Sequence, residues 1–365
     1  MALRELHIHH LRNLHGQRLE FSERVNLIHG ANGSGKTSLL EAIYYLSAGR
    51  SFRTSKHRNV VSRDSDLLTL FGRVDNEWGE QRLGISRDLG RGETILRKNG
   101  LRVHSLSEMA KELPVCVIEP GTFDLVAGGP GQRRRFLDWL VFHVEHDYGG
   151  LWQQCQKTIR QRNQLLRRGI INDGQLRSWN ARLVELAHQV TARRFHWFEQ
   201  FRTQLQKLFE QSQAAWATDL ELTFFRGWDS KRPLGDILET NQETEYRAGH
   251  TLYGPNRCDL RVRINQRPAS EVLSRGQQRT LVILMKLAQM AVVNGRRQDY
   301  AICLVDDINA ELDHANQKVL AERLLGLGCQ LFVTSIEPPD KGLWADSAAQ
   351  DHRMFHVEHG EFSEQ

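Results

Sequence analysis

The chain has 365 residues, of which 40% are hydrophobic and 25% are charged, so it can bury a sizeable core and is not a disordered chain. No apolar run approaches the roughly 20 residues of a membrane helix, and the first ten residues are polar, so we expect no membrane partner and no secretion signal. The five cysteines are scattered without a C-x-x-C pair, which argues against a disulfide framework or a zinc site and favours a cytoplasmic location.

The net charge of +5 is unevenly distributed along the chain. Residues 133–232 contain 17 Lys+Arg and 10 Asp+Glu, a net of +7, which leaves −2 for all other residues. A basic segment of this kind is typical of proteins that bind polyanions, so we expect nucleic acid as a partner.

Residues 1–30 are predicted to form three strands, the last of which leads into the motif GANGSGKT. An apolar strand before this motif and a helix after it are the context of a phosphate loop, G-x-x-x-x-G-K-[ST]. Its glycines let backbone N–H groups converge on a phosphate. Lys36 is expected to reach the β- and γ-phosphates of ATP or GTP, and the Thr37 hydroxyl to bind Mg²⁺. The predicted nucleotide contacts in this loop are Gly30, Ala31, Asn32, Gly33, Ser34, Gly35, Lys36 and Thr37.

Two features flank this site. His7, His9 and His10 fall on the first predicted strand and are interpreted as surface or packing residues, not metal ligands. A basic run follows the loop helix and contains Arg50, Arg53, Lys56 and Arg58. This run is either a solvated surface loop or a patch that contacts DNA phosphates beside the nucleotide site.

The middle of the chain changes from strands to helices. Residues 60–105 are predicted to form antiparallel strands, and residues 115–118 a short buried strand. Residues 131–232 are helical and basic, and they contain six of the eight tryptophans. We interpret most of these tryptophans as the core of a helical lobe, the alternative being a platform on which bases stack. The predicted domains are thus a head, residues 1–130 with 233–365, and this inserted lobe.

A second phosphate-binding motif is predicted at residues 273–277, which read LSRGQ and open an apolar helix. The Ser274 hydroxyl, the Gly276 N–H, Gln277 and the helix N-terminus would together receive a γ-phosphate. Since the chain already has a phosphate loop, this points to a nucleotide shared between two copies. The alternative is an ordinary N-capped helix.

The string AICLVDD at residues 301–307 is typical of a Walker B strand. Asp306 would hold Mg²⁺ through water, and Asp307 is placed as the general base that polarises the attacking water. Asp313 lies in a stretch that would cross the interface between two copies. Thr334 follows the next core strand and is predicted to sense the γ-phosphate.

These motifs, in this order, resemble the ABC-type ATPase head. The predicted fold is therefore α/β, a mixed sheet with N-terminal antiparallel strands and an inserted helical lobe. An ABC transporter nucleotide-binding subunit is the alternative, but it should carry a histidine at the switch, where this chain has Thr334. A P-loop kinase would have no use for the motif at 273–277.

Further stretches resemble one family, the RecF proteins of bacterial recombinational repair. They are LRNL at 11–14, GRSFRT at 49–54, GGPGQRRRFLD at 128–138, QRN at 161–163, GPNRCDL at 254–260, SRGQQRTL at 274–281 and VDDINAELD at 305–313. The chain departs from the family's usual pattern at Gly121, Asn256, Cys258 and Arg275, while Ser274 and Gly276 are kept.

The resemblance implies an ATP-dependent DNA-binding protein that dimerises head-to-tail on ATP, with Mg²⁺, and acts in recombinational repair and replication-fork maintenance. The implied DNA is duplex or gapped, including single-stranded regions. The implied partners are RecO and RecR, and the implied outcome is the loading of RecA. Asp307 is one methylene shorter than the glutamate usual in ABC ATPases, so we expect slow ATP hydrolysis, stimulated by DNA.

Overall fold

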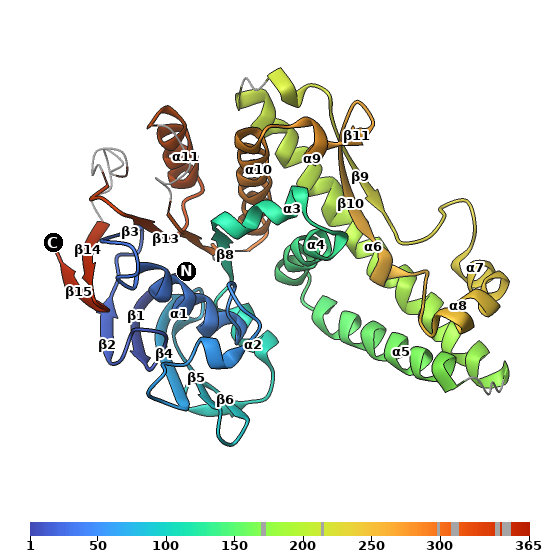
Figure 1. Cartoon of the computed structure of the whole chain (residues 1–365), viewed down its shortest axis with the longest axis horizontal. Helices are drawn as coiled ribbons and strands as arrows, with labels where there is room; N and C mark the ends of the chain where they lie inside the picture. The colour runs from blue at the N-terminus through green and yellow to red at the C-terminus, as the bar shows by residue number, and fades with distance from the viewer. Residues whose placement is uncertain (169–172, 213–214, 298–299, 308–313, 340–343, 345–351) are drawn as a thin grey trace. The chain divides into compact units, whose positions relative to one another are not determined.

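The computed structural model describes residues 1–168, 173–212, 215–297, 300–307, 314–339, 344 and 352–365. They fall into two compact units, coloured along the chain in Figure 1. Unit 1 comprises Met1–Thr122 and Val293–Gln365, and unit 2 comprises Phe123–Val292.

Unit 1 contains a mixed sheet in the order β15-β14-β3-β13-β12-β8. All neighbours in it are parallel except β14 and β15. Every residue of β3, β8, β12 and β13 is buried, as expected for parallel strands covered on both faces. The strands are β3 (Val25–His29), β8 (Val115–Ile118), β12 (Ile302–Val305), β13 (Leu331–Ser335), β14 (His352–Glu358) and β15 (Glu361–Glu364).

The second sheet of unit 1 is antiparallel, in the order β2-β1-β4-β5-β6-β7. Buried and partly exposed residues alternate along β4, because one face of the sheet covers the core. Asn99 and Gly100 both have positive φ, at +52° and +83°, in the turn between β6 and β7, which is typical of a tight Asn-Gly hairpin. The strands are β1 (Ala2–His9), β2 (Gln17–Glu20), β4 (Leu67–Asn76), β5 (Gly79–Asp88), β6 (Glu93–Lys98) and β7 (Leu101–Val103).

Helix α1 (Lys36–Ala48) contacts strands of both sheets, β4 and β5 on one side and β8 and β13 on the other. It is therefore the centre of the hydrophobic core of unit 1, which includes Leu39, Ile43, Leu70 and Phe332. The remaining helices are α2 (Leu106–Glu112) and α11 (His314–Gly326), with short 3-10 turns η1 (His57–Asn59) and η2 (Pro120–Phe123).

The C-terminal segment corrects one expectation. The sequence after Glu337 predicts a surface tail, but β14 pairs in parallel with β3 and β15 folds back on β14. Met354, Phe355 and Val357 are buried. Figure 1 shows the result: the red C-terminal strands lie beside the blue strand that leads to the phosphate loop.

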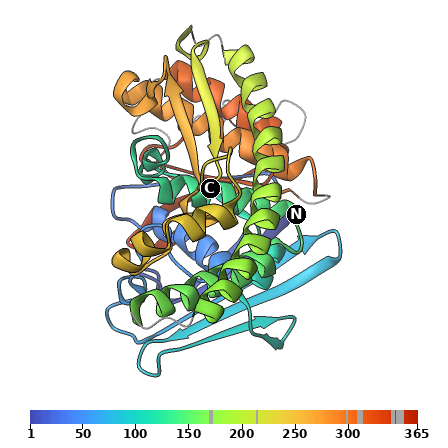
Figure 2. The same ribbon diagram turned by 90° about the vertical axis from the view of Figure 1, so that its right-hand side faces the viewer.

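Unit 2 combines long helices with a small antiparallel sheet, β11-β10-β9. Figure 2 shows its longest helix, α6, in yellow-green. The helices are α3 (Asp124–Ala127), α4 (Pro130–Val144), α5 (Tyr148–Arg168), α6 (Asp173–Ser212), α7 (Leu234–Thr240), α8 (Gln242–Ala248), α9 (Ala269–Val272) and α10 (Arg275–Asn294), with 3-10 turns η3 (Ala215–Ala217) and η4 (Pro255–Arg257). The strands are β9 (Leu220–Phe225), β10 (Asp259–Ile264) and β11 (Arg267–Pro268).

The unit boundaries differ from the predicted domain boundaries, because residues 233–292 group with the helical lobe. Strand β10 pairs with β9 over six residues. The guanidinium of Arg133 on α4 donates two hydrogen bonds to the Asp259 carboxylate, at 2.8 and 3.1 Å. Arg134 donates to the carbonyl of Cys258 at 3.0 Å. Hydrophobic periodicity does not reveal such polar links between distant segments.

The tryptophans of residues 133–232 support the core interpretation. Trp197 and Trp228 are buried, and Trp139, Trp152, Trp179 and Trp216 are partly buried. None of the helices in the described ranges combines the length and the apolar character needed to cross a bilayer.

Candidate nucleotide-binding site

The phosphate loop lies between β3, which ends at His29, and α1, which begins at Lys36. Gly30, Gly33 and Gly35 have φ values of +151°, +79° and +129°, a region that favours glycine. A Cβ on Gly30 would lie 2.3 Å from the carbonyl oxygen of Val357, so packing also requires glycine there. Among the described residues no side chain caps the first turn of α1. Its N–H groups are therefore available to an anion.

Lys36 extends over this loop. Its ammonium donates hydrogen bonds to the carbonyls of Gly30 at 2.7 Å and Ala31 at 2.9 Å. An ammonium has three N–H donors, so one remains for a phosphate oxygen. Burial lowers the pKa of Lys36, and the nearby carboxylates of Asp307 and Asp306 oppose that shift. The side chain is thus a buried cation that an anionic ligand would stabilise.

Three elements meet at Asp306, which follows β12. The Thr37 hydroxyl, on α1, lies 2.9 and 3.0 Å from the two carboxylate oxygens. The Thr334 hydroxyl, on β13, donates to Asp306 Oδ1 at 2.8 Å and accepts from the Asp307 N–H at 2.8 Å. The structure therefore brings Thr37 and Asp306 together as predicted. Thr334, predicted as a phosphate sensor, forms hydrogen bonds to both Asp306 and Asp307 in this structure.

Asp307 adopts φ +53°, which is uncommon for a residue other than glycine. Its Oδ1 is buried and accepts no hydrogen bond from the described residues. Backbone strain and an unsatisfied buried acceptor together are typical of a functional site. Asp313, predicted to cross the interface between copies, lies outside the described residues.

The oxygens of Thr37 and Asp306 fit a Mg²⁺ ion, because hard cations prefer hydroxyl and carboxylate ligands. Burial raises the pKa of Asp306, against the hydrogen bonds from Thr334 and Thr37. A cation beside this carboxylate would offset the penalty of keeping it ionised in the interior.

The raised pKa of Asp306 gives a testable pH dependence. Its folded-state value lies above the unfolded one, so ionised Asp306 destabilises the fold at neutral pH, and this cost disappears as the pH falls through the folded value. We expect Mg²⁺-dependent nucleotide binding to weaken as the pH falls from 7.5 toward 5, and to weaken less in Asp306→Asn. Calorimetric titrations measure the nucleotide affinity with and without Mg²⁺ at each pH. If Mg²⁺ increases the affinity as much at pH 5 as at pH 7.5, the expectation is contradicted.

Two residues of the LRNL turn support the phosphate loop, a role that the sequence did not reveal. The Asn13 amide donates to the Ser34 carbonyl at 3.0 Å and accepts from the Ser38 hydroxyl at 2.8 Å. Arg12 makes a two-pronged ion pair with the buried carboxylate of Glu41 on α1, at 2.8 and 2.9 Å. The turn thus fixes the loop to the start of α1.

The C-terminal hairpin supports the loop from another side. The Gly360 N–H donates to the Ser34 carbonyl at 2.7 Å. A Cβ on Gly360 would lie 2.3 Å from the Asn13 carbonyl, and φ there is +87°. The alternation of Phe355 and Val357 with the polar residues His356 and Glu358 was the sequence signal for this strand.

The second predicted phosphate-binding motif belongs to unit 2. The Ser274 N–H donates to Gln277 Oε1 at 2.9 Å, and the Gln277 N–H donates to the Ser274 hydroxyl at 3.3 Å. These reciprocal bonds form a capping box at the start of α10, so the N-capped helix is present. Ser274 and Gly276 are exposed, and a Cβ on Gly276 would meet no described atom within 4 Å. Nothing within the described chain therefore requires glycine at this position.

The predicted DNA contacts Arg50, Arg53, Lys56 and Arg58 are all exposed. Arg58 binds the loop that follows it, donating to the carbonyls of Ser65 at 2.9 Å and Arg63 at 3.0 Å and to Asp66 Oδ1 at 2.8 Å. Arg53 is close enough to Asp306 for its charge to lower the pKa of that carboxyl. Arg58 thus has a structural role, and the charge of Arg53 acts on the carboxyl group of the nucleotide site.

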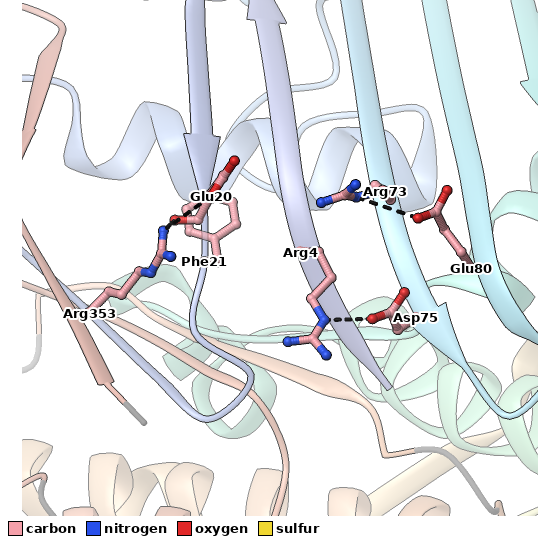
Figure 3. Close-up of a pocket in the computed structure, with 7 residues that line it drawn as sticks. All are labelled: Arg4, Glu20, Phe21, Arg73, Asp75, Glu80 and Arg353. Atoms are coloured by element: carbon pink, nitrogen blue, oxygen red, sulfur yellow. Dashed lines mark hydrogen bonds and ion pairs between the residues drawn. The ribbon is translucent and has the colours of Figure 1, made fainter. Parts of the chain in front are cut away.

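A separate pocket of about 390 Å³ in unit 1 is lined by residues outside the phosphate loop (Figure 3). Three arginines and three acidic residues line it with Phe21. Arg4 pairs with Asp75 at 2.6 Å, Arg73 with Glu80 at 3.8 Å and Arg353 with Glu20 at 3.8 Å. Because these charges compensate one another, the pocket has no net attraction for an ion, and we assign it no ligand.

Known proteins resemble this chain over its whole length. The family model described as the RecF/RecN/SMC N terminal domain matches residues 2–360. Proteins named "DNA replication and repair protein RecF" from Marinobacter nauticus and Cellvibrio japonicus are 48% and 42% identical to it, and the matches cover all of this chain and 100% and 99% of those proteins.

Solved structures agree with this assignment. A structure described as the recombination mediator protein RecF-ATP in the RecFOR pathway has a TM-score of 0.87 and 27% identity, covering 100% of this chain and 97% of that one. An SMC head bound to the C-winged helix domain of ScpA has a TM-score of 0.57 and 15% identity, over 100% and 97% of the two chains, and supports the fold alone. The predicted α/β ATPase-head fold is confirmed, and the chain belongs to the RecF family, whose members carry an ATP-binding ATPase domain.

Proposed function

We propose that this chain is an ATP-dependent DNA-binding protein of replication and recombinational repair, in which ATP controls a head-to-tail dimer. The observation that carries the proposal is the convergence of Lys36, Thr37 and Asp306 around a glycine loop whose helix N-terminus is uncapped by any described side chain. Backbone N–H groups, a buried cation and a hydroxyl–carboxylate pair are the parts that bind a Mg²⁺–nucleoside triphosphate.

In this proposal Thr37 and Asp306 hold Mg²⁺, which neutralises charge on the phosphates when bound. Asp307 accepts the proton of the attacking water. Its backbone is fixed by the bond from its N–H to Thr334, and its free carboxylate oxygen is the acceptor that the reaction needs. The short aspartate side chain reaches less far than a glutamate, so hydrolysis is slow. DNA binding is proposed, as a separate effect, to accelerate it.

The dimer is supported by Gly276. Glycine in a helix is less stable than alanine by about 1 kcal/mol, and neither packing nor backbone angle demands it here. Close approach of another molecule is the remaining reason for glycine in the exposed first turn of α10. We propose that this molecule is the nucleotide held by the phosphate loop of a second copy, received by Ser274, Gly276 and Gln277. Asp313 would lie at the same interface.

Sedimentation of the full chain tests the dimer directly. We expect a monomer without nucleotide and a dimer in saturating Mg²⁺–ATP, with duplex DNA bound only by the dimer. Ser274→Arg, which places a bulky cation at the shared phosphate, should stay monomeric in ATP. A native chain that remains monomeric at saturating ATP and DNA would contradict the proposal.

Substitution of Gly276 separates its effect on the helix from its effect on the dimer. We expect Gly276→Ala to stabilise helix α10 by up to about 1 kcal/mol and so to raise the melting temperature slightly. The same substitution should weaken ATP-dependent dimerisation at least tenfold, on the order of 1.4 kcal/mol. Gly150→Ala is the matched control, because Gly150 is also exposed in the first turn of a helix with open space around its Cβ position. If Gly276→Ala and Gly150→Ala both dimerise as the native chain does, Gly276 does not contact the shared nucleotide.

DNA binding is proposed to be electrostatic and largely independent of sequence, so affinity should fall steeply with added salt. Duplex and gapped DNA with single-stranded regions are the proposed substrates. RecO and RecR are the proposed partners in loading RecA, in the cytoplasm, since a similar structure is described within the RecFOR pathway. The transporter alternative is not favoured, because the similar proteins are named for DNA replication and repair.

A further inference from the structure

Two histidines and an aspartate form a cluster in unit 1 that the proposed function does not use. His10, His15 and Asp64 each place one ligand atom within 4.8 Å of the other two. The rings of His10 and His15 are 6.2 Å apart in an edge-to-face arrangement, and His15 Nδ1 lies 3.6 Å from Asp64 Oδ2. Because His10 and Asp64 are far apart in sequence, only the fold brings them together.

Backbone hydrogen bonds hold this cluster in place. The Ser62 N–H donates to the His10 carbonyl at 2.9 Å, and the Arg12 N–H donates to the Val60 carbonyl at 2.8 Å. The Ser62 hydroxyl also donates to the Arg12 carbonyl at 2.8 Å. Across the turn between His10 and His15, Leu11 and Leu14 exchange two hydrogen bonds of 2.9 and 2.7 Å. The backbone of His10 and the segments next to His15 and Asp64 are therefore held together before any ligand binds.

His10 shows two features that packing leaves unexplained. Its φ is +61°, which is uncommon for a residue other than glycine. Its Nδ1 is buried and has no hydrogen-bond partner among the described residues. An unsatisfied buried imidazole nitrogen is costly in an apolar setting, and a metal ion would satisfy it.

We propose that His10, His15 and Asp64 bind a divalent transition-metal ion such as Zn²⁺. Imidazole nitrogens favour Zn²⁺, Co²⁺, Ni²⁺ and Cu²⁺ over Mg²⁺, which prefers oxygen ligands. Ligand atoms in a tetrahedral zinc site are roughly 3.4 Å apart, given zinc–nitrogen distances of about 2.0–2.1 Å. The side chains of His15 and Asp64 are 58% and 62% exposed, so they are free to move. Their ligand atoms, now within 4.8 Å of one another, can approach to the spacing of a zinc site. This replaces our interpretation of His10 as a packing residue.

The metal would brace the turn that supports the phosphate loop. Asn13, within this turn, binds the Ser34 carbonyl and the Ser38 hydroxyl. A metal that ties His10 and His15 to Asp64 spans the turn from both ends and restricts its motion. The proposed metal site is thus a structural site that stabilises the turn next to the phosphate loop. It is separate from the Mg²⁺ site formed by Thr37 and Asp306.

Titration of the metal-stripped full chain with Co²⁺, followed by displacement with Zn²⁺, tests this site. We expect one Co²⁺ per chain with visible absorption bands and no thiolate charge-transfer band, since all five cysteines are buried. His15→Ala and Asp64→Asn change exposed side chains and should fold normally, yet weaken binding at least about tenfold. His10→Ala should do the same. Zn²⁺ should raise the melting temperature of the native chain and slow hydrogen exchange of residues 10–16.

His9→Ala is the matched control, because His9 is an exposed neighbour outside the cluster. It should bind Co²⁺ as tightly as the native chain. The proposal is overturned if His15→Ala and Asp64→Asn bind as the native chain does, if His9→Ala loses as much affinity as they do, or if a thiolate band appears. ATP binding need not be measured, so failure here leaves the proposed function intact.

Discussion

Replacing Lys36 with methionine is expected to abolish the ATP-dependent dimer while leaving the fold intact. Methionine fills nearly the same volume but removes the ammonium that lies over the phosphate loop, held by the Gly30 and Ala31 carbonyls. A hydrogen bond to a charged group contributes about 1.5–3 kcal/mol, so ATP should bind about 10- to 100-fold more weakly. Calorimetric titration gives this affinity, and sedimentation at an ATP concentration that saturates the native chain but not the variant gives the oligomeric state.

The stability of the same variant distinguishes a binding role from a structural one. Burial lowers the pKa of Lys36, which means that the folded chain holds its charge at a cost. The melting temperature of nucleotide-free Lys36→Met should therefore equal or exceed that of the native chain. Lys56→Met removes an exposed lysine from the same unit and should bind ATP normally. A Lys36→Met chain that still dimerises with ATP would rule out the proposed mechanism.

The parts of the site that could be predicted are those encoded by short, contiguous motifs. Glycines at 30, 33 and 35, Lys36 and Thr37 lie within one strand–loop–helix unit, so local sequence determines their geometry. The Walker B strand was equally clear, because an apolar strand that ends in two acids has few other interpretations. Their meeting through Thr37 and Asp306 follows from the parallel order of β3, β13 and β12.

The supporting contacts could not be predicted, because each joins segments far apart in sequence. Asn13 reaches Ser34 only because the LRNL turn is fixed to residues 60–62. Gly360 reaches the same carbonyl because β14 adds to the edge of β3. Nothing in the basic run shows that the guanidinium of Arg58 will bind the carbonyls of Ser65 and Arg63.

A buried polar network in unit 2 is a further set of contacts that the sequence does not predict. Arg162, within the QRN stretch, is fully buried together with Glu245. Its guanidinium donates to Asn180 Oδ1 at 2.7 Å, to Thr251 Oγ1 at 2.9 Å and to the Glu245 carboxylate. The other Glu245 oxygen accepts from the Leu252 N–H at 2.7 Å. The network joins α5, α6 and α8 with the loop that follows α8, which gives Arg162 of the family-like QRN stretch a structural role.

Arg162→Met is expected to destabilise unit 2 by about 3–5 kcal/mol, because it leaves the Glu245 carboxylate buried without its cation. For a unit of this size each kcal/mol lowers the melting temperature by about 2–4 °C, and tryptophan fluorescence reports it because most tryptophans lie in unit 2. Arg182→Met breaks an exposed ion pair with Glu185 on the same helix and should change stability by less than about 1 kcal/mol. Adding Glu245→Leu to Arg162→Met should restore part of the loss, since no buried charge is then uncompensated. If Arg162→Met and Arg182→Met have the same melting temperature, the network does not stabilise the unit.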